Sequence, residues 1–218
     1  MRVDLHTHTF PASSCSEIDH ESYVRRCREA GFGAIALTNH GSIADNLVLE
    51  RPLADAGIVL VHGVEISTLF GDFIIYSPDL DYLGGLRDIQ GLPRHGEIPD
   101  TAAIVWVHPV AGGGRSGSSF YSGLADEVGP VIDGVEVCNG NWTGGRYVET
   151  AREIATRFDL AATGGSDAHR ADRIGRCLTE VAGVVASTSG VVGAIKDRAT
   201  MAVAPVRPAG LFGRLLGR

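Results

Sequence analysis

Two histidines separated by one residue, at the end of the first apolar segment, constrain this chain more than any other feature. The segment runs from Asp4 to Thr9 and reads Asp-Leu-His-Thr-His-Thr. In a β-strand, residues i and i+2 lie on one face, roughly 7 Å apart, so the imidazoles of His6 and His8 can turn toward one point. A metal ion is the simplest occupant of that point, while a structural pair of histidines is the alternative reading.

Four later segments repeat the arrangement, in which a short apolar run ends on a residue able to bind a cation. They lead to Thr38-Asn39-His40, His62-Gly63-Val64-Glu65, His108-Pro109 and Gly165-Ser166-Asp167-Ala168-His169. Short apolar runs bounded by Gly, Pro or Asn predict buried parallel strands. Because α/β folds place their chemistry at the carboxyl ends of such strands, the five segments predict a single site.

The motifs HTH, TNH, GVE, HP and SDAH, in this order and at these separations, resemble those of the polymerase and histidinol phosphatase (PHP) family of metal-dependent phosphoesterases. The resemblance runs from Arg2 to about Gly175. It implies an α/β fold, specifically a distorted seven-stranded β/α barrel with two or three metals in its mouth.

The resemblance also implies the metal ligands, position by position. A shared carboxylate, Glu65, would bridge two cations, which suits a group with two oxygens. The mixed nitrogen and oxygen donors favour Zn²⁺, Mn²⁺ or Fe²⁺ over Ca²⁺ or Mg²⁺. We therefore expect two to three divalent metal ions as cofactors. The three implied groups are His6, His8, Glu65 and Asp167; Glu65 and His108; and His40 and His169.

The chain departs from the family pattern at two positions. Where relatives have Asp or His in the loop after HTH, this chain has Cys15 among serines, and where many have a His some seven residues after the bridging Glu, it has Asp72. Asp72 remains a candidate oxygen ligand. Cys15 is either a thiolate ligand of the third metal or an inert small residue. We expect two firmly held metals and a weak or empty third position.

Four further residues are candidates for contact with substrate. Arg115 lies in a Gly/Ser-rich stretch after His108, which is either a phosphate-binding rim or an ordinary surface loop. His95 lies in a loop region. Glu136 and Asn139 end an expected strand, 134–138, where they would orient substrate or support the ligands.

A phosphoesterase mechanism follows from the expected site. Water activated between two cations attacks phosphorus in line, and His40 or His169 can act as the acid toward the leaving oxygen. With Glu65 as the bridge, these are the expected catalytic residues. The expected substrate is a small phosphomonoester, such as a nucleotide or a sugar or amino-alcohol phosphate. The alternatives are another metal-dependent hydrolase, acting on amides or esters, and a non-catalytic metal-binding regulatory domain.

The composition of the chain limits the number of domains and the classes of binding partner. The 218 residues, 44% of them hydrophobic, fit one domain over 1–218, with 205–218 expected as a flexible tail rather than a docked segment. A formal net charge of −7 without a Lys/Arg cluster argues against a nucleic-acid platform, although a nucleotide or short oligonucleotide remains possible as substrate. Bound cations would then have to attract the phosphate.

Cysteine spacing and the first residues suggest a location. The four cysteines form no C-x-x-C pair and no short-scaffold spacing, so we expect neither a zinc knuckle nor a disulfide framework, and a reduced cytoplasm is the default. The chain starts without an apolar leader and contains no run long enough to span a bilayer, so no membrane association is expected.

Overall fold

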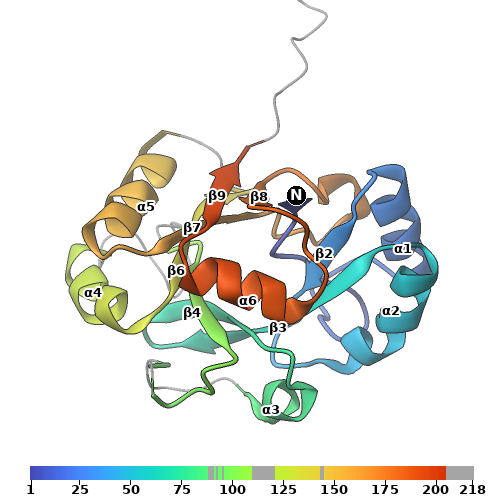
Figure 1. Cartoon of the computed structure of the whole chain (residues 1–218), viewed down its shortest axis with the longest axis horizontal. Coiled ribbons are helices and arrows are strands. Elements are labelled where there is room, and N and C mark those ends of the chain that lie inside the picture. The colour runs from blue at the N-terminus through green and yellow to red at the C-terminus, as the bar shows by residue number, and fades with distance from the viewer. Residues whose placement is uncertain (88–90, 92, 95, 110–120, 143–144, 205–218) are drawn as a thin grey trace, which may run out of the picture.

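A curled, mixed sheet of six strands forms the centre of the protein (Figure 1). The computed structural model describes residues 1–218 except 88–90, 92, 95, 110–120, 143–144 and 205–218. Neighbouring strands are parallel except around β4, which runs antiparallel to both β3 and β5. The strands, in their order across the sheet, are β2 (Ala34–Leu37), β3 (Val59–Thr68), β4 (Gly71–Tyr76), β5 (Ala103–Val107), β6 (Gly134–Asn139) and β7 (Ala161–Gly165).

A second, antiparallel sheet contains β1 (Arg2–Val3), β8 (Leu178–Val181) and β9 (Thr200–Val203), in the order β1-β8-β9. The segment after β1 forms single parallel bridges, Asp4 to Ile35 in the edge strand β2 and Thr7 to Ala168 in the loop after β7. The architecture is thus a mixed α/β fold whose curled sheet resembles a barrel. The opening segment contacts that sheet through the Asp4 bridge and not as a full seventh strand.

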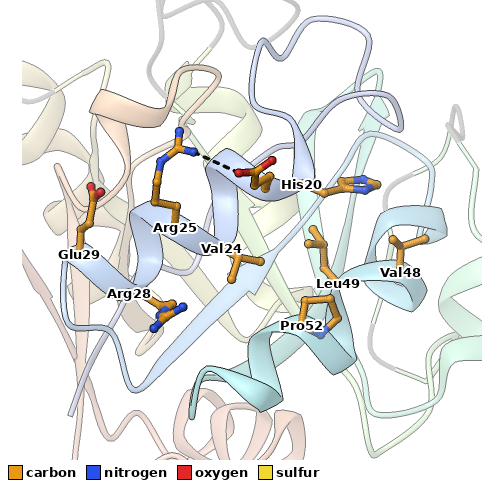
Figure 2. A pocket seen from close by; sticks show the side chains of 9 residues that line it. His20, Val24, Arg25, Arg28, Glu29, Val48, Leu49 and Pro52 are labelled. Carbon is orange, nitrogen blue, oxygen red and sulfur yellow. Dashed lines mark ion pairs between the residues drawn. The ribbon is translucent and has the colours of Figure 1, made fainter.

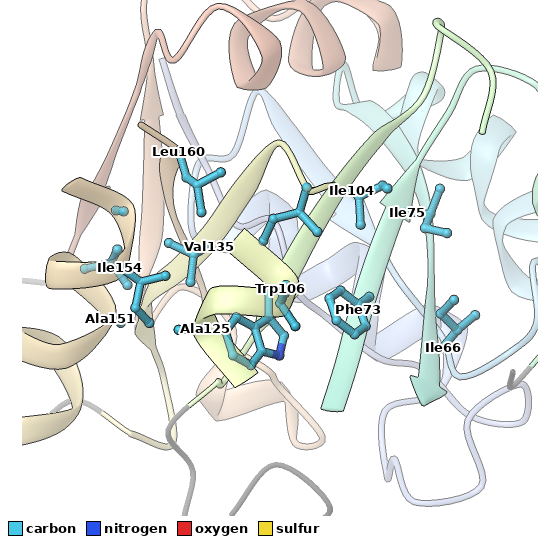
Figure 3. Close-up of a cluster of buried hydrophobic side chains, with 14 of the residues drawn as sticks. Ile66, Phe73, Ile75, Ile104, Trp106, Ala125, Val135, Ala151, Ile154 and Leu160 are labelled. Carbon is cyan, nitrogen blue, oxygen red and sulfur yellow. The ribbon is translucent and has the colours of Figure 1, made fainter. Parts of the chain in front are cut away.

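Side chains that point alternately to the two faces of the strands form two apolar layers. On β5, Ala103 and Val105 belong to an inner cluster that also includes the buried face of the last helix. Ile104 and Trp106 belong to an outer cluster, in which the Trp106 ring stacks on Phe73 with a centroid separation of 6.2 Å (Figure 3). This period of two is the pattern expected for strands that are covered on both faces.

Helices cover the outside and one end of the curled sheet (Figure 1). Helix α1 begins after Asp19, whose carboxylate accepts a hydrogen bond from the Ser22 N–H, as expected for an N-cap. Val191 and Ile195 of α6 pack into the inner cluster. No helix of the described part of the chain is long and apolar enough to cross a membrane. The helices are α1 (His20–Glu29), α2 (Ala44–Asp55), α3 (Leu80–Gly85), α4 (Tyr121–Val128), α5 (Gly145–Arg157) and α6 (Thr188–Lys196), with short 3₁₀ turns at Gly129–Val131 and Ala171–Arg173.

The structure contains one disulfide, although the cysteine spacing indicated no disulfide framework. Cys138 at the end of β6 is bonded to Cys177 just before β8, across a sequence separation of 39 residues. Gly164 of β7 pairs with Cys138, and a Cβ atom there would lie only 2.5 Å from the Leu178 carbonyl oxygen. The absence of a side chain on Gly164 therefore allows the two cysteine-bearing segments to approach each other.

Replacing Cys138 with Ser should lower the free energy of unfolding by about 3 kcal/mol, because the bond no longer restricts the unfolded chain. The midpoint of thermal unfolding should then fall by about 10 °C relative to the oxidised wild type. Calorimetry without reductant measures this, with the exposed free thiol variant Cys15→Ser as control. Equal midpoints for Cys138→Ser and Cys15→Ser would contradict the prediction.

Candidate metal centre

Ionisable side chains from the predicted strand ends meet in one buried cluster. The Nε2 atoms of His6 and His8 lie 3.1 Å apart. The Asp167 Oδ1 atom lies 3.5 Å from the His6 Nε2 atom and 3.4 Å from the His8 Nε2 atom. Both imidazoles are at most 1% exposed. Both rings therefore approach a common point, as the sequence predicted, although His6 and His8 lie beyond β1 in a segment with a single bridge at Thr7.

Glu65 lies at the centre of the cluster and is only 1% exposed. Its Oε1 atom is 3.1 Å from the His108 Nε2 atom. Its Oε2 atom is 3.1 Å from the His40 Nδ1 atom and 3.3 Å from the His8 Nε2 atom. The two oxygens thus face different histidines, which is the arrangement that a bridging carboxylate requires.

Three groups of side chains, within the part of the chain that the structure describes, have ligand atoms close enough to share a metal ion. His40 and His169 are the accessible members, with side chains 43% and 30% exposed. Their rings flank His8, at centroid separations of 4.6 and 4.4 Å. The three groups are His6, His8 and Asp167; His6, Glu65 and His108; and His8, His40 and His169.

Glu136 and Asn139 lie behind the ligand atoms. The Glu136 Oε1 atom is 3.0 Å from the His6 Nδ1 atom, while its Oε2 atom accepts hydrogen bonds from the His108 backbone N–H and the Asn139 amide, both at 2.9 Å. The Asn139 amide also donates to Asp167 at 3.3 Å. Both residues are at most 2% exposed, and they contact His6, His108 and Asp167, a position that suits support of the candidate ligands.

The remaining predicted residues are not part of the three groups. The Asp72 Oδ2 atom lies 3.8 Å from the His108 Nδ1 atom, whereas Glu65 contacts the Nε2 atom of the same ring. Cys15 is an exposed free thiol. Arg115 and His95 lie outside the described residues, as does the tail 205–218. Substrate contact by Arg115 and His95 and ligation by Cys15 and Asp72 therefore stay predictions.

Serines of the loop after HTH support the ligands in a way that the sequence analysis missed. The Ser13 hydroxyl oxygen accepts a hydrogen bond from the His40 N–H at 3.1 Å and lies 3.4 Å from the His8 Nδ1 atom. The Ser16 hydroxyl donates to the His8 carbonyl oxygen at 3.1 Å. Serine is common in loops, so no sequence signal separates these two from ordinary loop residues.

Asp4 joins three segments of the site and was also missed as a functional residue. Its carboxylate accepts hydrogen bonds from the backbone N–H groups of Ser166 and Gly175, both at 2.8 Å, and of His6 at 3.3 Å. Complete burial raises the pKa of Asp4 to about 6 despite these bonds. Its position two residues before His6 of the HTH motif was the only available signal.

The electrostatics of the cluster favour a cation. Burial lowers the pKa of His8 to about 4, so this ring is neutral, as a ligand must be. Burial alone would also lower the pKa of His108, but the hydrogen bond and charge of Glu65 outweigh it and raise that pKa to about 9. The neighbouring carboxylates, Asp167 first, likewise raise the pKa of His6. Protons on these rings balance the buried carboxylates, and the nitrogen and oxygen donors fit divalent transition metals.

Metal binding at pH 7 should release protons. His6 and His108 have raised pKa values and carry protons at this pH in the metal-free protein, whereas a metal ligand must be deprotonated. Adding Mn²⁺ to protein in weakly buffered solution should acidify it, as a pH indicator dye would record. The release should shrink as the starting pH rises past 9, and metal binding at pH 7 without proton release would contradict these protonation states.

Comparison with known proteins gives two family matches. The family described as PHP domain matches residues 4–93, and that described as PHP-associated matches residues 145–200. A stretch of 64 residues is 39% identical to the DNA polymerase III PolC-type of Thermotoga maritima. That stretch is 29% of this chain but only 5% of the polymerase, so the chain spans a small part of this curated relative.

Solved structures with low sequence identity share the fold. PsfC from Pseudomonas syringae PB-5123 superimposes with a TM-score of 0.68 at 18% identity, covering 94% of this chain and 91% of PsfC. A two-domain protein from Bacteroides vulgatus, which contains a predicted PHP-like metal-dependent phosphoesterase, also gives 0.68, at 20% identity over 94% of this chain and 64% of its own. At these identities the comparison establishes similarity of fold.

Proposed function

The chain belongs to the PHP family, and from this we propose that it hydrolyses phosphate esters with the help of two to three divalent metal ions. The observation that carries the proposal is the position of Glu65, with each carboxylate oxygen close to a different histidine. Zn²⁺, Mn²⁺ or Fe²⁺ bound there would polarise a phosphoryl group and increase the acidity of water. The expected holders are the three groups of side chains described above.

The buried residues of the cluster suit metal binding, and the partly exposed ones suit proton transfer. His6, His8 and Asp167 are buried and fixed by hydrogen bonds, so they suit a holding role. His40 and His169 are partly exposed at the edge of the cluster, where a substrate can reach them. If the third position is weakly occupied, the protonated ring of either residue can donate its N–H proton to the leaving ester oxygen.

A small phosphomonoester is the substrate class that we propose, such as a nucleotide or a sugar or amino-alcohol phosphate. The chain has a net charge of −7 and no cluster of Lys and Arg, so attraction of a phosphate would come from cations in the centre. A long nucleic acid would instead require many basic contacts along its backbone. A panel of phosphomonoesters, phosphodiesters and short oligonucleotides, assayed with measured metal content, distinguishes these classes.

Two alternative functions would give different results with the substrate panel. A metal-dependent amide or ester hydrolase would need the same centre but would leave phosphate esters intact. A non-catalytic metal-binding domain is suggested by the match to part of a DNA polymerase. It would bind metal without turnover of phosphate, amide or ester substrates, so the panel should include an aryl ester and an anilide.

Replacing Glu65 with Gln should lower phosphatase turnover by more than about a hundredfold, because it removes the charge of the proposed bridge while conserving volume. Steady-state kinetics with a generic aryl phosphate and elemental analysis measure turnover and metal content together. The exposed Glu149→Gln change on α5 removes the same charge far from the cluster and serves as control. An active Glu65→Gln enzyme with full metal content would show that the bridge is wrongly assigned.

Cys15→Ser should change metal content and turnover very little, because the thiol is exposed and lies outside the three ligand groups. Ser13→Ala, two residues away, should lower turnover about tenfold, since it removes a hydroxyl that holds the His40 backbone and adjoins His8. The same kinetic and elemental measurements compare the pair. Loss of one metal equivalent specifically in Cys15→Ser would establish the cysteine as a ligand and contradict this expectation.

A further inference from the structure

A cavity of about 770 Å³ lies between α1 and α2, and none of the residues of the metal centre lines it (Figure 2). Val24 of α1 faces Leu49 and Pro52 of α2 across the cavity and gives it an apolar floor. Val48 lies beside this floor and is 53% exposed. An apolar surface between two charged helices is suited to a ligand with an apolar body.

A histidine that the proposed reaction does not use, His20, forms one end of this cavity, and a buried aspartate lies behind it. The His20 Nε2 atom lies 3.0 Å from the Asp45 Oδ1 atom. Asp45 is 3% exposed, and its Oδ2 atom also accepts a hydrogen bond from the Thr9 hydroxyl at 2.7 Å. The His20 side chain is 32% exposed and lines the cavity, so the ring is accessible to a ligand, while its buried Nε2 atom makes no hydrogen bond despite lying close to Asp45.

An arginine forms the other end. Arg28 follows His20 and Val24 at intervals of four residues, so the three share a face of α1. Figure 2 shows Arg28 on the side of the helix that faces Pro52, and Glu21, Arg25 and Glu29 also line the cavity. Arg25 pairs with Glu21 at 3.8 Å, but no carboxylate among the described residues lies within ion-pair distance of the Arg28 guanidinium.

We propose that this groove binds a small amphiphilic anion. Arg28 pairs with the carboxylate or phosphate of the ligand, its apolar body covers Val24, Leu49 and Pro52, and a hydrogen-bonding group at its far end meets His20. Two turns of helix separate His20 from Arg28, a rise of about 12 Å. This span matches a medium-length alkyl chain with a polar group at each end. Since Asp45 also holds Thr9, the site adjoins the segment that carries His8 without including it.

Titration of the full chain with 10-hydroxydecanoate tests the proposal, because this probe has an anion, an alkyl chain and a hydroxyl in the required order. Calorimetry should show saturable binding of one equivalent. Decanoate, which lacks the hydroxyl, and decane-1,10-diol, which lacks the charge, should each bind more weakly. If decane-1,10-diol bound as tightly as 10-hydroxydecanoate, the assignment of Arg28 as the partner of the anion would be wrong.

Matched variants locate the binding site. Arg28→Gln should weaken binding of the hydroxy acid about fivefold, the upper range for an exposed ion pair. Arg51→Gln removes an exposed arginine of α2 that pairs with Asp55 outside the cavity, and should leave binding unchanged. Val24→Trp should cover the apolar floor with a bulky ring and abolish binding, with circular dichroism confirming that the variant is folded.

Three results would overturn the proposal: no saturable binding at millimolar probe, equal weakening by Arg28→Gln and Arg51→Gln, or full binding to folded Val24→Trp. The Glu65→Gln variant should bind the probe normally, because Glu65 does not line the cavity. Loss of phosphatase activity in that variant therefore tests the proposed function, while probe binding tests the groove, and each can fail without the other. Loss of binding in Glu65→Gln would place the probe in the metal centre and overturn the proposal.

Discussion

Burial of several carboxylates in one small volume is the constraint on which this structure depends. Glu65, Glu136 and Asp167 come from three different strands or strand ends, and none is more than 9% exposed. Removing a carboxylate from water is costly unless positive charge and hydrogen bonds compensate it. Here five imidazoles, backbone N–H groups and side-chain amides converge on the carboxylates, so the fold must hold all of these segments in register.

The fold meets this requirement by fastening the ends of distant segments to one another. Asp4 ties the first segment to the loop that carries Asp167 and to the turn at Gly175. Cys138 ties the end of β6, which carries Glu136 and Asn139, to the start of β8. Glycines allow the necessary close approach: a Cβ atom on Gly165 would lie 2.2 Å from that of His6. The ligand positions and the packing behind them are therefore one structural unit.

Local sequence patterns predicted a strand, a helix cap and the meeting of the strand-end ligands. The apolar run 103–107 is β5, Asp19 caps α1, and the strand-end histidines and acids meet in one cluster. Contacts between distant segments were not predictable in this way. The disulfide depends on the alignment of Cys138 with Gly164, and the orientation of Glu136 toward His6 depends on the curl of the sheet. Neither feature can be inferred from residue spacing or hydrophobic periodicity in the sequence.

The supporting side chains have a consequence for how such a centre evolves. Ser13, Asn139 and Asp4 contact ligands or their backbone without being ligands, so changes at these positions would alter the geometry while leaving every expected ligand in place. The same reasoning separates the accessible His40 and His169 from the buried members of the cluster. Under the proposed function, the buried members would hold the cations and the accessible ones would meet the substrate.

The central claim is that this buried cluster holds at least two divalent cations that share Glu65. Anomalous diffraction from crystals grown with Mn²⁺, measured on both sides of the metal absorption edge, tests it directly. The account predicts two or more peaks, one among His6, His8 and Asp167 and another beside His108, with Glu65 contacting both. A map with no peak in the cluster, or with a single fully occupied peak that Glu65 does not contact, would contradict it.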